Sequence, residues 1–132
     1  FRVRKFEKAV AKYLGTKYCL ATTSGTMAQF IAMKAMGIKQ GDEVITQSFT
    51  FVATVEAILL LGAKPIIANV DESLNMCPKE LNKLISKRTK LIIPVPMLGN
   101  PCDMKNIMKI AKKRKIPILE DACESLGAKY KG

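Results

Sequence analysis

The sequence predicts an α/β protein with a mainly parallel, open β-sheet that is covered by helices on both faces. Segments with the apolar spacing of a helix alternate with short apolar runs, as in repeated strand–helix units. The runs at residues 65–68 and 91–93 are continuously apolar, which is typical of strands buried on both faces. A chain of 132 residues, 48% of them hydrophobic, is long enough for one domain with a core.

The chain begins with a predicted helix that ends at Gly15, a residue suited to the left-handed position that closes many helices. Residues 18–21 follow as a predicted strand. The helix has one apolar face at helical spacing, which leaves its basic residues to solvent. The residues of this apolar stripe are Val3, Phe6, Val10 and Tyr13.

The alternation continues to the end of the chain. A polar turn at residues 22–26 leads into a helix that carries Met27 and is closed by Gly37. Pro78 stands where a proline is favoured, in the first turn of a helix. The other predicted elements are strands at residues 43–46, 65–70, 91–95 and 116–119 and helices at residues 51–61, 78–86 and 103–113. Five helices therefore alternate with five strands.

A net charge of +11 and a pI near 9.7 raise the question of nucleic-acid binding. Lys and Arg gather at residues 2–17, 79–90 and 105–115, and each of these segments has helical apolar spacing on its other face. We therefore interpret the charges as solvent-exposed helix faces. Attraction of anionic or phosphorylated substrates stays open as a second interpretation, and no nucleic-acid partner is expected.

The sequence does not indicate a membrane protein or a metal protein. No stretch approaches the roughly 20 apolar residues of a membrane helix, and the first residues lack the apolar core of a signal peptide. We therefore expect a soluble, cytoplasmic chain without a membrane partner. The four cysteines form no C-x-x-C pair and histidine is absent, so neither a metal site nor a disulfide framework is expected.

Ligands of open parallel sheets bind outside the carboxyl ends of the strands. Any function should therefore draw on the segments that follow the predicted strands. These segments are residues 22–26, 47–54, 71–75, 96–101 and 120–127.

Ser24, Gly25 and Thr26 form the first candidate site. Hydroxyl residues cap helices, and a glycine lets backbone amides approach an anion, so the turn can bind a phosphate group. An ordinary capped turn is the alternative. The segment has neither the Gly-Lys-Ser/Thr of a P-loop nor the three spaced glycines of a dinucleotide fingerprint.

Phe49 and Phe51 are two aromatic residues one position apart before a predicted helix. In extended backbone they point to the same side, so one of them can present its ring to a planar ligand. Packing in the core is the alternative interpretation.

The acidic pair of Glu120 and Asp121 stands at the carboxyl end of the last predicted strand, and Glu124 follows three residues after Asp121. In a helical turn, Asp121 and Glu124 lie on one side. A carboxylate at this place can hold a metal, act as a base, pair with a protonated ring nitrogen, or cap a helix. The metal is poorly supported because the chain has no histidine and few carboxylates at other strand ends.

Five motifs, taken together and in order, resemble the DegT/StrS family of pyridoxal phosphate-dependent sugar aminotransferases. Each motif is weak singly, but their order and spacing extend over nearly the whole chain. The motifs are Ser-Gly-Thr at residues 24–26, Gly-Asp-Glu-Val-Ile at 41–45, Phe-Thr-Phe-Val-Ala-Thr at 49–54, Leu-Gly-Ala-Lys-Pro at 61–65 and Glu-Asp-Ala-Cys-Glu-Ser-Leu-Gly-Ala at 120–128.

The resemblance implies a role for each candidate site residue. The turn of Ser24, Gly25 and Thr26 would bind the phosphate of pyridoxal phosphate, and Phe51, rather than Phe49, would stack on the pyridine ring. Asp121 would hold the pyridine nitrogen. Glu124 stands where the family usually has glutamine or histidine near the ring hydroxyl.

The resemblance also implies a reaction and its partners. The family transfers an amino group from an amino acid, with glutamate as the expected donor, to a keto sugar that is usually nucleotide-linked. Such a reaction serves the biosynthesis of cell-surface polysaccharides and related sugars. The full-length form is expected to be a homodimer.

The resemblance further implies that residues 1–132 form a single partial domain, the cofactor-binding part of an aspartate aminotransferase-like large domain. The family's Schiff-base lysine lies downstream of the Glu-Asp pair, and neither Lys129 nor Lys131 matches it. We therefore expect a fragment that lacks this lysine, the remaining strands and the small C-terminal domain. The alternatives are a keto-sugar dehydratase of the same family, in which histidine replaces the lysine, and a small noncatalytic α/β module that binds anions.

Overall fold

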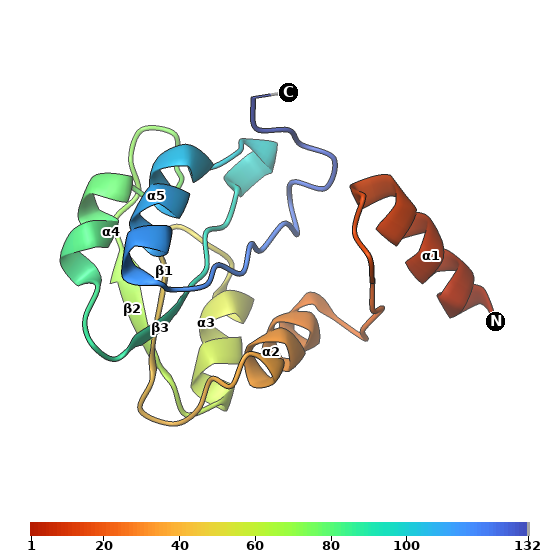
Figure 1. Cartoon of the computed structure of the whole chain (residues 1–132), viewed down its shortest axis with the longest axis horizontal. Coiled ribbons are helices and arrows are strands. Elements are labelled where there is room, and N and C mark those ends of the chain that lie inside the picture. The colour runs from red at the N-terminus through yellow and green to blue at the C-terminus, as the bar shows by residue number, and fades with distance from the viewer. Residues whose placement is uncertain (132) are drawn as a thin grey trace.

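The structure is a computed structural model that describes residues 1–131, which form five α-helices, three β-strands and one 3₁₀ turn (Figure 1). All five predicted helices are confirmed, and none of those in the described part has the length and hydropathy needed to span a membrane. The helices are α1 (Arg2–Leu14), α2 (Gly25–Ala35), α3 (Val52–Leu60), α4 (Pro78–Leu84) and α5 (Met104–Arg114). The strands are β1 (Glu43–Gln47), β2 (Lys64–Ala68) and β3 (Thr89–Ile92), and the turn is η1 (Met97–Gly99).

The three strands form one parallel sheet in the order β2-β1-β3. β1 pairs with β2 without a register shift, from Glu43 opposite Lys64 to Gln47 opposite Ala68. The pairing of β1 with β3 shifts once, directly after Glu43. The predicted fold class, a parallel sheet with helices on both faces, is confirmed.

The segment that follows α5 lies along β3 but is too irregular to be a strand. Ile92 N donates to Pro117 O at 3.2 Å, and Leu119 N donates to Ile92 O at 3.0 Å, around a single parallel bridge. Pro94 and Pro117 lack the N–H groups that a longer ladder needs. The strand predicted at residues 116–119 therefore has the predicted place and direction, but the structure forms only a single bridge there.

The predicted strand at residues 18–21 is wrong. Tyr18 and Leu20 are 78% and 69% exposed, and Ala21 N donates to Glu7 Oε1 of α1 at 2.9 Å rather than to another strand. A strand is stable only where a neighbour satisfies its backbone groups, and no strand within residues 1–131 lies beside this segment. The five predicted strands are therefore three.

α1 lies at one end of the molecule, apart from the layers around the sheet (Figure 1). It ends at Gly15, which has a φ of 67°, as the sequence indicates. Its apolar stripe is not buried, since Val3, Phe6 and Tyr13 are 57%, 60% and 70% exposed. An apolar face of this extent is typical of a surface that contacts another protein segment.

Two hydrophobic clusters pack on opposite faces of the sheet. Neighbouring strand residues belong to different clusters because successive side chains of a strand alternate between its faces. The cluster between the sheet and α2 with α3 consists of Met33, Ile38, Val44, Ala57, Ile58, Ala63, Leu91, Ile93, Val95 and Met97. The cluster between the sheet and α4 with α5 consists of Ile45, Ala68, Met76, Leu81, Ile92, Cys102, Ile107 and Ala111.

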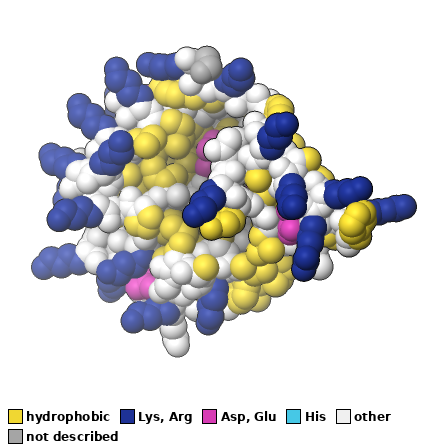
Figure 2. All heavy atoms as spheres, turned by 45° about the vertical axis from the view of Figure 1, so that its right-hand side comes forward, with side chains coloured by type: hydrophobic (Ala, Val, Ile, Leu, Met, Phe, Trp, Pro, Cys, Tyr) yellow, Lys and Arg dark blue, Asp and Glu magenta, His cyan; other side chains and the backbone are white. Residues whose placement is uncertain are grey.

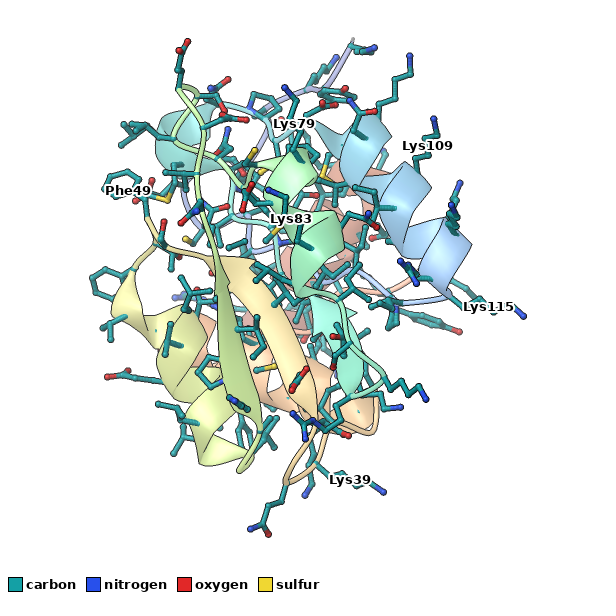
Figure 3. All side chains as sticks on the ribbon, turned by 90° about the vertical axis from the view of Figure 1, so that its left-hand side faces the viewer. Lys39, Phe49, Lys79, Lys83, Lys109 and Lys115 are labelled. Atoms are coloured by element: carbon teal, nitrogen blue, oxygen red, sulfur yellow. The ribbon has the colours of Figure 1, made fainter. Side chains whose placement is uncertain are left out.

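The positive charge is concentrated on the side of the sheet that α4 and α5 cover. Residues 79–115 contain eleven of the 22 Lys and Arg residues and two of the 11 Asp and Glu residues, a net charge of +9 out of +11. Lys79, Lys83 and Lys109 project from these two helices (Figure 3), and basic side chains also stand out between apolar patches in Figure 2. The interpretation of these charges as exposed helix faces holds for the basic residues of α4 and α5, whereas Lys87, Arg88 and Lys90 lie in the turn and strand that follow α4.

Gln47, the last residue of β1, ties together the chain segments that follow the three strands. Its side chain is fully buried, and Nε2 donates to Phe49 O at 2.8 Å. Its Oε1 accepts from Met76 N and Val95 N, each at 3.1 Å. The carboxyl end of the sheet therefore has loops with fixed mutual positions.

We expect Gln47→Leu to lower the free energy of unfolding by about 2–4 kcal/mol, because two buried N–H groups lose their acceptor. Urea denaturation followed by circular dichroism measures this change. Gln40→Leu is the matched control, since Gln40 is exposed and its replacement should change the free energy of unfolding by less than about 0.5 kcal/mol. Equal effects of the two substitutions would contradict the role given to Gln47.

Candidate functional site

A cavity of about 360 Å³ lies between α2 and the segment that follows the bridge to β3. Its walls are α2, through Gly25, Gln29 and neighbouring alanines, and residues 119–123. The cavity therefore brings Gly25 and Asp121 together, although they are 96 positions apart in sequence. These are the central residues of the predicted anion turn and of the predicted carboxylate site.

A larger hollow of about 780 Å³ lies between α4 and α5. Lysine and asparagine side chains and a few apolar groups line it, with Asp71 and Asp103 among them. None of the six predicted site residues contributes to it. Size alone therefore does not identify the site. The smaller cavity, unlike the larger one, is lined by two of the predicted site residues, Gly25 and Asp121.

Asp121 is held from the backbone and from two helices. Its N–H donates to Pro94 O at 3.1 Å, which continues the alignment of this segment with the end of β3. Its Oδ2 accepts from Gln29 Nε2 of α2 at 2.7 Å and from Thr54 Oγ1 of α3 at 2.8 Å. The carboxylate therefore has a fixed position at the carboxyl end of the sheet.

The turn before α2 has the features of an anion site. Ser24 is the N-cap in extended conformation, and its Oγ accepts from Met27 N at 3.2 Å. Within residues 1–131, the N–H groups of Gly25 and Thr26 have no hydrogen-bond acceptor, as expected of a helix start. A Cβ at Gly25 would meet nothing within 4 Å, so the backbone faces open space. An anion can approach these amides at the positive end of the helix.

Phe51 is the N-cap residue of α3 and is 70% exposed. Its carbonyl accepts from Thr54 N at 3.3 Å, so it lies one helical turn before a residue that binds Asp121. Phe49 is 44% exposed and points away from the body (Figure 3). The alternative that this pair packs in the core is wrong, and Phe51 is free to cover a ligand.

Glu124 lies outside the walls of the cavity. Its Oε2 accepts from the backbone N–H of Leu98 at 2.8 Å. Leu98 has a φ of 54°, an uncommon conformation for a residue with a side chain, and belongs to the turn η1. The structure therefore gives Glu124 a role in fastening this turn, and its contact with the cofactor ring stays a prediction.

Gln29 and Thr54 were not among the site residues predicted from the sequence. Each is a polar side chain buried in a helix, with 8% and 1% of its surface exposed. The signal in the sequence is weak: Gln29 stands among apolar residues of α2, and Thr54 is the last residue of the motif at residues 49–54. A bond to a carboxylate far away in sequence has no local signature.

Cys123 also lines the cavity, next to Asp121. Cys123 is exposed as a residue, but partial desolvation raises the pKa of its thiol to about 11, and the hydrogen bond and negative charge of Asp121 add to this effect. The thiol is therefore protonated at neutral pH. Within residues 1–131, no group of three His, Cys, Asp or Glu side chains is arranged to hold a metal ion.

The fold and this site define a class of protein. A parallel α/β sheet with a helix start whose amides are open and with a fixed carboxylate beside it is an arrangement found in proteins that bind phosphate-bearing cofactors. The chain belongs to the DegT/DnrJ/EryC1/StrS aminotransferase family, whose model matches residues 2–132. The resemblance stated from the sequence motifs is confirmed.

Individual relatives agree with this assignment. The chain is 46% identical over 131 residues to the UDP-2-acetamido-2-deoxy-3-oxo-D-glucuronate aminotransferase of Pseudomonas aeruginosa, covering 98% of this chain and 36% of the relative. The structure of NtdA from Bacillus subtilis with bound cofactor PMP matches with a TM-score of 0.93 and 37% identity, over 95% of this chain and 29% of NtdA.

A dehydratase matches as well. The structure of GDP-4-keto-6-deoxymannose-3-dehydratase with a trapped PLP–glutamate geminal diamine has a TM-score of 0.92 and 31% identity, over 98% of this chain and 36% of that protein. The chain therefore spans about a third of the length of the proteins it matches.

We expect Cys123 to react slowly with iodoacetamide at pH 8, with a rate that rises about tenfold per pH unit up to a pKa of about 11. Asp121→Asn should lower this pKa and speed the reaction at pH 8, because it removes a negative charge beside the thiolate. Peptide mapping by mass spectrometry measures alkylation at Cys123. If Asp121→Asn leaves the rate of alkylation at pH 8 unchanged, the contact between Asp121 and the thiol of Cys123 is contradicted.

Proposed function

We propose that this chain is the cofactor-binding part of a pyridoxal phosphate-dependent sugar aminotransferase. The whole protein would transfer an amino group from an amino acid, with glutamate as the favoured donor, to a keto sugar, usually nucleotide-linked. The cavity shared by Gly25 and Asp121 carries this proposal. The family match and the aminotransferase relative from Pseudomonas aeruginosa support it.

The residues of the cavity and of the adjoining turn before α2 fit the chemical groups of pyridoxal phosphate. The amide groups of Gly25 and Thr26 suit the phosphate, and the open space above Gly25 leaves room for it. Asp121 suits a protonated ring nitrogen, because a carboxylate accepts strong hydrogen bonds from cations. The two binding features therefore lie at opposite walls of one cavity, as a molecule with a phosphate and a ring nitrogen requires.

Each residue of this chain has a binding or orienting role in the proposed reaction. Pyridoxal phosphate, when bound, withdraws electrons from the substrate, most strongly when its ring nitrogen is protonated. Asp121 would accept a hydrogen bond from the N–H of the ring and so keep the ring nitrogen protonated. The site is partly buried, where the attraction between the carboxylate and the positive ring is strong. Ser24, Gly25 and Thr26 would hold the phosphate, Phe51 would cover the ring, and Glu124 would approach the ring hydroxyl.

The wider setting of the reaction is also a proposal. The named substrate of the Pseudomonas relative, a UDP-linked keto sugar acid, supports a nucleotide-linked sugar and a role in polysaccharide biosynthesis. We further propose that the full-length protein works in the cytoplasm. We also propose that it forms a homodimer, since α1 and α3 present apolar residues such as Phe6 and Leu60 to solvent. The Schiff-base lysine would belong to a part of the protein outside these 132 residues.

A keto-sugar dehydratase of the same family is the second candidate. The match to GDP-4-keto-6-deoxymannose-3-dehydratase over 98% of this chain supports it. The two candidates share the cofactor site proposed for this chain, and the residue at the position of the Schiff-base lysine separates them. Reading the coding DNA downstream would identify that residue as lysine or histidine.

We expect the chain to bind pyridoxamine phosphate, which forms no covalent bond with a lysine and therefore tests the cavity itself. Asp121→Asn should weaken binding at least about tenfold, because the ring N–H loses its charged acceptor. Fluorescence titration measures the affinity, and Glu72→Gln, at an exposed carboxylate of another strand end, is the control. Equal affinities of the Asp121→Asn and Glu72→Gln variants, or no binding to the unsubstituted chain, would favour a noncatalytic anion-binding module.

We expect the isolated chain to transfer no amino group from glutamate, because no lysine matches the family's anchor position. We also expect it to self-associate through exposed apolar residues, and Val3→Ser with Phe6→Ser in α1 to reduce this association. Formation of 2-oxoglutarate measures the reaction, and light scattering measures the mass of the particles. Amino transfer by the isolated chain would contradict the first expectation. A monomer at all concentrations would contradict the expected self-association.

A further inference from the structure

Two neutral side chains from different helices converge on one oxygen of Asp121. Gln29 Nε2 and Thr54 Oγ1 lie 2.7 Å and 2.8 Å from Oδ2, and both side chains are buried. Within residues 1–131, the other oxygen, Oδ1, accepts only the longer bond of 3.3 Å from Cys123 N. Oδ1 therefore keeps the capacity to accept a further hydrogen bond.

The amide of Gln29 is oriented by this carboxylate. Its NH₂ group must face Asp121, because the opposite orientation would place the amide oxygen against a carboxylate oxygen. In that orientation Oε1 is buried and has no hydrogen-bond partner within residues 1–131. A buried carbonyl without a partner is destabilising, so the bond to Asp121 is the one favourable polar contact of this side chain.

The position of Gln29 links the two ends of the cavity. It lies one turn after Gly25 in α2, and both residues line the cavity that Asp121 also lines. A rigid helix therefore carries the amides of the anion turn and the donor that holds the carboxylate. The separation between the two binding features is set by this helix.

We infer that Gln29 and Thr54 are positioning residues that saturate Oδ2 of Asp121 and reserve Oδ1 for the ring nitrogen of the cofactor. This inference rests on the proposed function and adds to it two residues with a defined task. Neither residue touches the ring nitrogen. They act by restricting the rotation of the carboxylate, which otherwise has two equivalent oxygens and a freely turning χ2 angle.

The test compares two probes that differ at one atom. The first is pyridoxamine phosphate, and the second is its 1-deaza analogue, in which a C–H group replaces the ring nitrogen. Both have the same phosphate, so both report an intact cavity. Only the first can donate a hydrogen bond from the ring position that faces Asp121.

Four variants are titrated with both probes. Gln29→Met removes the donor and keeps the length of the side chain, and Thr54→Val removes the hydroxyl and keeps the shape. We expect each to weaken the binding of pyridoxamine phosphate about tenfold and that of the deaza analogue less than about twofold. Thr54→Ser, which keeps the hydroxyl, should retain the preference of the unsubstituted chain, and Gln40→Met at an exposed glutamine should change neither affinity.

The outcomes separate the inference from the function on which it rests. If the unsubstituted chain prefers pyridoxamine phosphate and Gln29→Met keeps this preference, the positioning role is overturned and the proposed function stands. If both affinities fall together, Gln29 is merely structural, and the inference is again overturned. If the unsubstituted chain binds neither probe, or binds both equally, the ring nitrogen does not meet Asp121 and both proposals fail.

Discussion

The hydrogen bonds that Gln29 and Thr54 donate to Asp121 join the two helices on one face of the sheet to the segment beside β3. The site depends on this junction, because the backbone of Asp121 is aligned by its N–H bond to Pro94 O and its side chain by these two donors. The helix that carries Gln29 also begins with the open amides of Gly25 and Thr26. These two hydrogen bonds therefore fix the Asp121 carboxylate relative to the start of α2, where we propose that the phosphate binds.

Stability and function share the same groups at this junction. Gln29 and Thr54 are buried polar side chains that need an acceptor, and Asp121 supplies it. The opposite end of the sheet has a buried carboxylate of its own, since Glu43 at the start of β1 accepts hydrogen bonds from the side chains of Ser86 and Arg88. The core provides two apolar layers, and the polar contacts of Asp121 at the carboxyl end of the sheet are the ones that line the cavity.

Local patterns were sufficient for the helices and for the order of the elements, since caps such as Ser24 and stops such as Gly15 act within a few residues. The strand predicted at residues 18–21 failed because strand formation needs a partner that no local pattern reveals. Asp121 was accessible from its place after the segment beside β3, and Ser24 to Thr26 were accessible from the capping residues of a helix start. Gln29 and Thr54 were not, because their role arises from contacts over 92 and 67 positions.

The most direct test of the central claim is a crystal structure of the chain with pyridoxamine phosphate. We expect the phosphate at the N–H groups of Gly25 and Thr26 and the ring nitrogen within hydrogen-bond distance of Asp121 Oδ1, with Gln29 and Thr54 still bound to Oδ2. A ligand bound between α4 and α5, or a ring nitrogen without contact to Asp121, would contradict the account.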